Sequence, residues 1–504
     1  MRLKSIVALL LVSIYALTVL CPVSAMEKKP LPLATVFKPS KSPLVSFRIQ
    51  FLTGAIDDPK GKEGVASLTA AMIAGGGTKK HTYDEIVEAF YPLAAGFGSQ
   101  ADKEMTTFIG TTHVDNLDKY YALVREMMFE PGFRDEDFKR LKDDAINYLK
   151  VSLRNNNDEE LGKERLYNLI YAGHPYESNN TGKISSLEKL TIADVKAFYA
   201  KNYTQANVVL GLSGNFSTKF SKEMYADFQK LPAGKKVVRA IPAPKTTPGM
   251  KIDIVQRETQ STAISLGFPI AANRKSLDYA ALALVASYFG QHRSSSSYLY
   301  QKLREKRGLN YGDYAYIEYF PRGMFQFEPD PNLARHQQIF QIWIRPVEPK
   351  NGHFTLRAAL YEYDKLVKNG LSQEDFENTR NFLIKYVNIL TQTQSDELGY
   401  ALDSKYYGMA DYNAFMKIAL AKLTLADINR VIKKYLASNS MTVAMVTKDA
   451  EGLRKDILAG KTSPIKYNAL PPQNILDEDK IIQDYKINVS PANVTVTSVE
   501  KVFE

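Results

Sequence analysis

The six histidines of this chain are the first candidates for metal binding or acid–base chemistry. None stands four residues from another and none directly follows a glutamate, so no helix can offer two imidazoles and a carboxylate to one zinc ion. They are His81, His113, His174, His292, His336 and His353. His174 lies in an Ala-Gly-His-Pro-Tyr loop and His292 precedes Arg293 and a run of serines, and we expect structural roles for both. The sequence therefore predicts no metal site in this chain.

A basic segment offers hydrogen-bond donors instead. Residues 298–311 read YLYQKLREKRGLNY. This pattern predicts a helix whose last turn carries Lys306 and Arg307 near the negative end of the helix dipole, capped by Gly308. Arg304 and Tyr311 bring a guanidinium and a phenol, both of which can donate to substrate oxygens. The alternative is that both residues serve only the structure.

An internal repeat indicates the domains that position these residues. Residues 190–195 (LTIADV) match 423–428 (LTLADI), and 423 − 190 gives an offset of 233. A second echo, EDF at 136–138 and 374–376, gives 374 − 136 = 238. Each echo opens a predicted helix, and the Thr-x-x-Asp pairs are of the capping type. Two tandem copies of one domain follow.

Each copy reads as an α+β domain. In residues 45–51, apolar and polar residues alternate, which predicts a strand with one buried face. Helical patterns follow at 64–74, 83–90, 116–128, 135–153 and 193–201, and further strands are expected at 207–212 and 441–446. The expected architecture is an antiparallel sheet with helices stacked on one face, used twice.

Length and composition set the boundaries. A chain of 504 residues is too long for one hydrophobic core. We expect a cleaved signal peptide at 1–25, a first domain at 26–230, a Pro-rich linker at 231–250, a second domain at 251–470 and a polar tail at 471–504. Residues 494–499 of that tail are either a late edge strand or disordered.

Charge and cysteine content limit the partners and the cellular compartment that we expect for the protein. Loss of Arg2 and Lys4 with the signal lowers the net charge from +10 to +8. The basic residues are scattered among acids, so no nucleic-acid partner is expected. The apolar run at 6–20 is short for a membrane anchor. Cys21, the only cysteine, leaves with the signal, so no disulfide or thiol chemistry is expected. We expect an exported protein of the periplasm, with the extracellular space as the alternative.

Together with the doubled domain and the LREKRGLNY string, residues 64–78 (GVASLTAAMIAGGGT) resemble the insulinase (pitrilysin) family of zinc metallopeptidases, which includes mitochondrial processing peptidase. The resemblance runs to about residue 470. It implies two tandem α/β-sandwich domains of the mitochondrial-processing-peptidase-like metallohydrolase fold. The family's zinc helix carries H-x-x-E-H, and here those three positions hold Ser67, Ala70 and Ala71. Two methyl groups and a hydroxyl cannot bind zinc, so the motif reads as vacated.

The resemblance also implies roles for other residues. Arg304 and Tyr311 match family residues that reach a peptide held at zinc in the opposing domain, where they would orient a carbonyl and stabilise an oxyanion. The third zinc ligand is a glutamate in the family, where this chain offers only Asp143 or Asp144.

In the family, peptides add as a strand at a sheet edge, and the equivalent region here is roughly 98–108. Its candidate contacts are Gly98, Ser99, Thr106 and Thr107. The competing interpretation is an ordinary edge strand whose charges Asp102, Lys103 and Glu104 discourage pairing.

The expected function is that of a non-catalytic subunit. It would complete the substrate chamber of a heterodimeric zinc endopeptidase, with zinc bound by an H-x-x-E-H partner and no cofactor bound by this chain. The isolated chain should be inactive. The alternative is a non-enzymatic scaffold or peptide-binding protein of the cell envelope.

Overall fold

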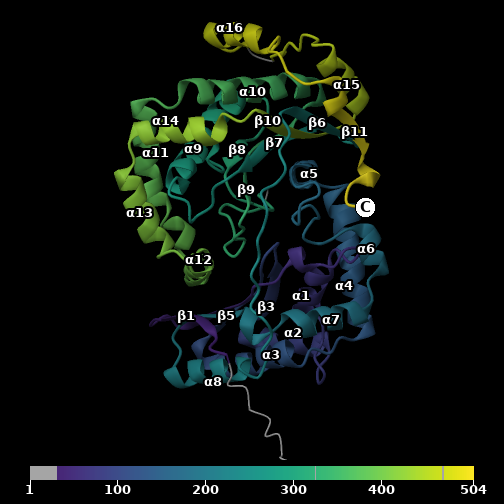
Figure 1. The fold of residues 1–504 in the computed structure, drawn as a ribbon, viewed down its shortest axis with the longest axis vertical. Helices are drawn as coiled ribbons and strands as arrows, with labels where there is room; N and C mark the ends of the chain where they lie inside the picture. The colour runs from purple at the N-terminus through teal and green to yellow at the C-terminus, as the bar shows by residue number, and fades with distance from the viewer. Residues whose placement is uncertain (1–30, 324, 468–469) are drawn as a thin grey trace, which may run out of the picture.

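The computed structural model describes residues 31–323, 325–467 and 470–504, so the expected signal peptide at 1–25 lies outside the described residues. Two sheet-and-helix halves face one another (Figure 1). The first half holds the strands up to β5, and the second begins with β6 and runs to the C-terminus. Within the described ranges, no helix is both long enough and apolar enough to cross a membrane.

The first sheet has the strand order β1-β5-β2-β4-β3. Its strands are β1 (Ala34–Pro39), β2 (Leu44–Phe51), β3 (Gly96–Ala101), β4 (Thr106–His113) and β5 (Val208–Gly214). β1 runs parallel to β5, and the other pairs are antiparallel. The helices of this half are α1 (Val65–Gly75), α2 (Tyr83–Phe90), α3 (Leu117–Phe129), α4 (Asp135–Asn147), α5 (Asp158–Ile170), α6 (Ile184–Lys189), α7 (Ile192–Asn202) and α8 (Thr218–Phe228).

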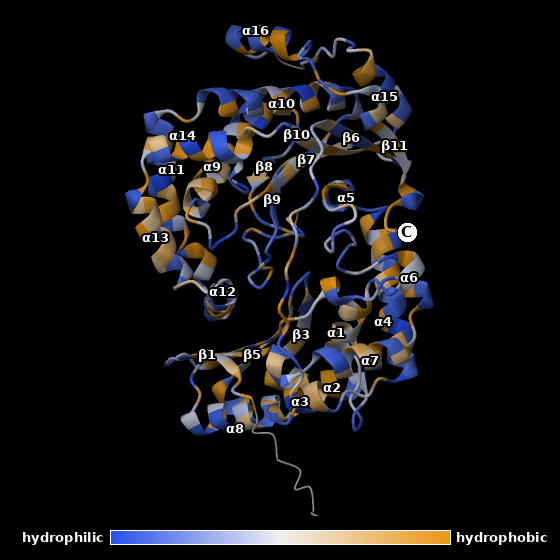
Figure 2. Cartoon of the chain, in the orientation of Figure 1, coloured by the Kyte–Doolittle hydropathy of each residue, from blue (hydrophilic) through white to orange (hydrophobic). Residues whose placement is uncertain are grey.

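The second sheet has the order β11-β6-β10-β7-β9-β8, in which β6 is parallel to both β10 and β11. Its strands are β6 (Gly249–Gln256), β7 (Thr262–Ile270), β8 (Asp313–Tyr316), β9 (Gln338–Val347), β10 (Ser440–Thr447) and β11 (Val494–Ser498). Its helices are α9 (Tyr279–Gly290), α10 (Gly352–Asn369), α11 (Gln373–Tyr386), α12 (Gln394–Tyr407), α13 (Tyr412–Lys422), α14 (Leu425–Val431), α15 (Ala450–Leu458) and α16 (Gln473–Ile482). Figure 2 shows apolar and polar residues alternating along these helices, as expected for helices with one buried stripe.

The sequence repeat corresponds to matching local structure. Thr191 caps α7 and Thr424 caps α14, and each forms a capping box with the aspartate three residues on, Asp194 and Asp427. The EDF echoes lie in the first turns of α4 and α11. Each half thus contains the same helix starts ahead of its parallel-paired strand, β5 or β10.

Each half covers the sheet of the other. Helix α5 packs on β7, β9 and β10 of the second sheet, whereas α12 packs on β1, β2 and β5 of the first. Because of this exchange, β2 is buried on both faces and not on one face as the alternation predicted. Phe47 and its alternate neighbours lie in the core, but Ser46, Arg48 and Gln50 are also buried, at 2%, 4% and 1% exposure. The polar face of β2 is covered because α12 lies against it.

The C-terminal segment is folded, and of the two alternatives for residues 494–499 the structure has the late edge strand. Strand β11 extends the edge of the second sheet, and α16 packs on α10. Beyond β11, the Arg154 Nε donates to the Val502 carbonyl at 2.7 Å, and the Ile184 amide donates to the Phe503 carbonyl at 2.8 Å. The last residues therefore fasten the second half to the first.

Candidate functional site: the cavity beside strand β3

Helix α1 holds the three positions of the vacated motif. Ser67 and Ala71 are half-buried one turn apart, whereas Ala70 is 1% exposed and belongs to the core. The helix starts at Gly64, whose φ is 105° and where a Cβ would lie 2.4 Å from the Thr181 carbonyl oxygen. Asp58 accepts hydrogen bonds from the Gly64 and Ala66 amides at 2.7 and 2.8 Å, so a carboxylate caps this helix. Helix α1 is therefore capped and packed although it lacks the zinc ligands of the family motif.

The expected substitute for the third ligand is not aimed at α1. Asp143 pairs with Lys139 along the solvent face of α4, with 2.8 Å between Nζ and Oδ2, and Asp144 is exposed. Across the described parts of the chain, no group of three or more His, Cys, Asp or Glu residues is placed to hold a metal ion. The residues of α1 and α4 do not fit zinc.

Strand β3 is the open edge of the first sheet. It pairs only with β4, and it carries Gly98 and Ser99. No atom lies within 4 Å of where a Cβ would stand at Gly96 or Gly98, so one face of the strand is unobstructed. Thr106 and Thr107 do not share this edge, because they lie on the interior strand β4 and are fully buried. Their assignment as edge contacts is corrected by the sheet order.

The charges in the β3–β4 turn do not guard the edge, as the alternative interpretation supposed. Asp102, Lys103 and Glu104 are 0%, 5% and 0% exposed. Arg335 of the second half donates to both oxygens of Asp102, from Nε at 2.9 Å and from Nη2 at 2.5 Å. Burial lowers the pKa of Lys103 to about 8. This turn joins the two halves.

Glu104 completes the junction. The His336 amide donates to Glu104 Oε1 at 2.8 Å, and the His336 ring lies 2.7 Å from Oε2. The Tyr176 and Tyr406 hydroxyls also donate to this carboxylate. The pKa of Glu104 is lowered by its hydrogen bonds to His336 and Tyr176, which outweigh burial. Sequence reasoning missed Arg335 and His336, because nothing local shows that they face residues more than 230 positions away.

The open edge borders a cavity of about 600 Å³ between the halves, which we call the chamber cavity. Residues 98–101 of β3 line one side, and α5 and the loop around Arg322 line the other. Among its charged side chains, Glu164 accepts a hydrogen bond from the Tyr319 hydroxyl at 3.0 Å, and Arg322 pairs with Asp330 at 2.6 Å. Burial raises the pKa of Glu164. Strand β3 is unpaired on its outer edge, so its main chain can add an extended peptide as a further strand.

Arg304 and Tyr311 lie on the second half and do not line this cavity. Tyr311 is 76% exposed, and the Arg304 guanidinium stands 5.8 Å from its ring centroid and 4.7 Å from that of Tyr300. Arg304 closes a π-helix, Tyr300–Glu305, and Gly308 with a φ of 63° ends the turn. One chain therefore does not bring this pair together with α1, and of the two only Tyr311 is exposed, whereas Arg304 is half-buried against Tyr300.

Arg307 behaves differently from its neighbours. It is 4% exposed and pairs with Glu478 at 2.8 Å and Asp479 at 2.7 Å, both on α16. Its Nη1 also donates to the Lys302 carbonyl at 2.7 Å, so the expected interaction with the helix end is present beside the two ion pairs. Part of the basic string therefore anchors the C-terminal segment.

The two histidines of interest have structural partners. His174 accepts from the Tyr176 amide at 3.0 Å and its Nε2 lies 2.9 Å from the Pro242 carbonyl oxygen. His292 lies 2.8 Å from the Gln326 carbonyl oxygen and contacts the Tyr316 hydroxyl. Burial lowers the pKa of His292 to about 4, so it is neutral at pH 7.

Comparison with known proteins decides the family. Residues 35–182 match the family described as Insulinase (Peptidase family M16), and residues 189–383 match the Peptidase M16 inactive domain. The chain belongs to the insulinase family. Among its insulinase-family relatives is an uncharacterized zinc protease of Rickettsia bellii, 23% identical over 78% of this chain and 90% of that protein. Another is the non-peptidase homolog YmxG of Helicobacter pylori, 20% identical over 66% of this chain and 72% of that protein.

Solved insulinase-family structures share the fold. The peptidase M16 inactive domain from Pseudomonas fluorescens has a TM-score of 0.72 and 24% identity, covering 82% of this chain and 94% of that one. The first half of the periplasmic protease PqqL from Escherichia coli has a TM-score of 0.62 and 15% identity, covering 92% of this chain and 99% of that one. These likenesses establish the two-domain α+β architecture.

Proposed function

We propose that this chain is an exported, non-catalytic insulinase-family subunit that completes the substrate chamber of a heterodimeric zinc endopeptidase. The observation that carries the proposal is α1, a capped and packed helix whose ligand positions hold Ser67, Ala70 and Ala71. The match of the second half to an inactive M16 domain and the description of the Helicobacter relative as a non-peptidase homolog support it. The fold likeness to a periplasmic protease favours export to the periplasm.

In this proposal the zinc belongs to an H-x-x-E-H partner, and this chain supplies binding surfaces. The unpaired edge of β3 offers main-chain hydrogen bonds to an extended peptide. The half-buried Arg304 and the exposed Tyr311 donate hydrogen bonds to the substrate carbonyl and to the oxyanion formed on it. Neither role requires a metal in this chain.

The test compares the isolated chain with the chain mixed with an H-x-x-E-H homologue encoded in the same genome. Alone, the protein should bind no stoichiometric zinc and cleave no peptide. In the mixture, Tyr311→Phe should lower kcat by roughly 10²-fold, the scale for loss of one oxyanion donor. Tyr91→Phe is the matched control, since Tyr91 is a tyrosine of the first half that is 86% exposed in the turn after α2. Chelator-sensitive hydrolysis by the isolated chain would overturn the proposal.

The open β3 edge also supports a second candidate, a peptide-binding protein without any proteolytic partner. Main-chain pairing needs no particular side chain, so binding can persist where chemistry is absent. This candidate predicts that an extended peptide binds the isolated chain and that no mixture with a homologue hydrolyses it. Restored hydrolysis in the mixture would exclude it in favour of the first.

A further inference from the structure

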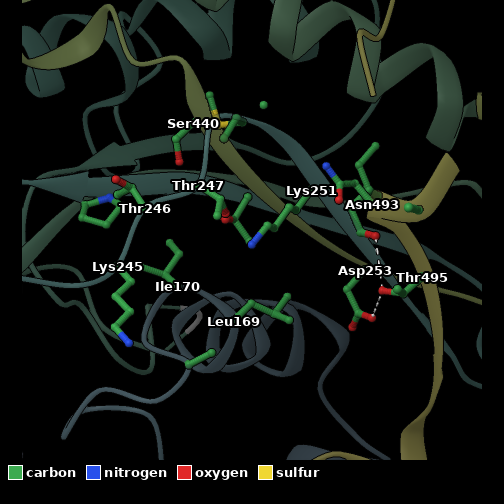
Figure 3. Close-up of a pocket in the computed structure, with 17 residues that line it drawn as sticks. Leu169, Ile170, Lys245, Thr246, Thr247, Lys251, Asp253, Ser440, Asn493 and Thr495 are labelled. Carbon is green, nitrogen blue, oxygen red and sulfur yellow. Dashed lines mark hydrogen bonds between the residues drawn. The ribbon is translucent and has the colours of Figure 1, made fainter. Parts of the chain in front are cut away.

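A separate cavity of about 320 Å³ lies on the face of the second sheet that α5 covers. Helix α5 covers this face but ends at Ile170, which leaves the first residues of β6 and β10 uncovered. The linker residues 245–247 and residues 492–495 of the C-terminal segment close the sides (Figure 3). None of its lining residues lines the chamber cavity.

The cavity combines an apolar wall with two ammonium groups. Leu169 and Ile170 of α5 and Pro269 of β7 supply the aliphatic surface. Lys245 extends from the linker, and Lys251 reaches across the cavity from β6 (Figure 3). Both lysines are exposed, and among the residues that the structure describes neither forms an ion pair.

The only carboxylate in the lining is already neutralised. Asp253 is 3% exposed and pairs with Arg165 of α5, whose Nε lies 2.8 Å from Oδ2. The hydroxyls of Thr495 and Thr497 each donate to its Oδ1 at 2.7 Å. The two lysines therefore leave the cavity with a net positive charge. Hydroxyls of Thr246, Thr247, Ser440 and Thr442 stand in the same lining.

We propose that this cavity binds a carboxylate carried on a short aliphatic group. The Lys251 ammonium holds the carboxylate through a charge-assisted hydrogen bond, and Lys245 adds positive charge on the linker side (Figure 3). The wall formed by Leu169 and Ile170 takes the aliphatic part, as in pockets where few polar groups orient a mostly apolar ligand. The C-terminus of a peptide ending in leucine and a free branched-chain acid share this chemistry.

Isothermal titration of the full chain tests the proposal with four probes: N-acetyl-Ala-Leu, its C-terminal amide, 4-methylpentanoate and inorganic phosphate. N-acetyl-Ala-Leu should bind with one-to-one stoichiometry and at least about tenfold more tightly than the amide and phosphate. Equal binding of 4-methylpentanoate would identify a free acid as the sufficient ligand, and weaker binding would identify the peptide terminus. Both results support the site.

Two variants localise the binding. Lys251→Met and Lys245→Met keep the aliphatic stem, and each should weaken binding about tenfold, with unchanged circular dichroism and Trp343 fluorescence. Lys219→Met, at an exposed lysine on α8, is the matched control and should bind like the unmodified chain. Undetectable binding of both acids, equal affinity for acid and amide, or unchanged affinity in both cavity variants would overturn the proposal.

Discussion

The buried pair between Asp102 and Arg335 is the sharpest place to test how the halves are joined. The two side chains are 0% and 2% exposed and form two parallel hydrogen bonds, at 2.9 and 2.5 Å. The Arg335 guanidinium also lies 3.6 Å from the ring centroid of Tyr319. Replacing Asp102 with Asn keeps the shape but leaves this guanidinium buried without a counter-charge. Removing one partner of a buried pair costs about 3–5 kcal/mol.

We expect Asp102→Asn to lower the free energy of unfolding by roughly that amount. The assay is denaturant unfolding followed by far-UV circular dichroism and by the fluorescence of Trp343, the only tryptophan of the chain and fully buried on β9. The double variant Asp102→Leu with Arg335→Met removes both charges and should recover more than half of the loss. Asp143→Asn, in an exposed pair on α4, should leave stability unchanged. A loss below about 1 kcal/mol for Asp102→Asn, or no recovery in the double variant, would refute this account of the junction.

Two further predictions concern the same junction. Trypsin should cut the exposed linker at Lys235 or Lys236. The two fragments should co-elute in native size-exclusion chromatography and separate only in denaturant, because each half contributes a helix, α5 or α12, that packs on the sheet of the other half. Separation in native buffer would show that the exchange does not hold them. The ion pair of His336 and Glu104 should make stability depend on pH. The hydrogen bond that the His336 ring donates to Glu104 raises the pKa of His336, so its contribution to stability is fully present below the unfolded value near 6.5 and is lost as pH rises through the folded value. Because the pKa of Glu104 is lowered, its contribution to stability is present above its unfolded value and is lost as pH falls. The difference in stability between the natural chain and His336→Gln should therefore be largest between about pH 4.5 and 6.5. A difference that grows at higher pH would contradict the pairing.

Local patterns predicted local structure well. The Thr-x-x-Asp echoes became capping boxes on α7 and α14, because a hydroxyl and a carboxylate three residues apart satisfy the free amides of a helix start whatever surrounds it. Alternation in residues 45–51 located β2, and its burial on both faces came from α12, about 350 positions away. The edge at β3 was predicted as a region, but two of its four proposed residues belong to β4, because strand order depends on which segments pair in space.

The sequence by itself determined the family, the doubled α+β domain and the loss of the zinc ligands, since residue identity decides whether a group can bind a metal. It could not show that Asp102 and Glu104 are buried and paired across the halves, that Arg307 anchors α16 while Tyr311 is exposed, or that the last residues fold back on the first half. Those outcomes depend on which distant side chains approach each charge and exclude water from it, and only the tertiary structure decides that.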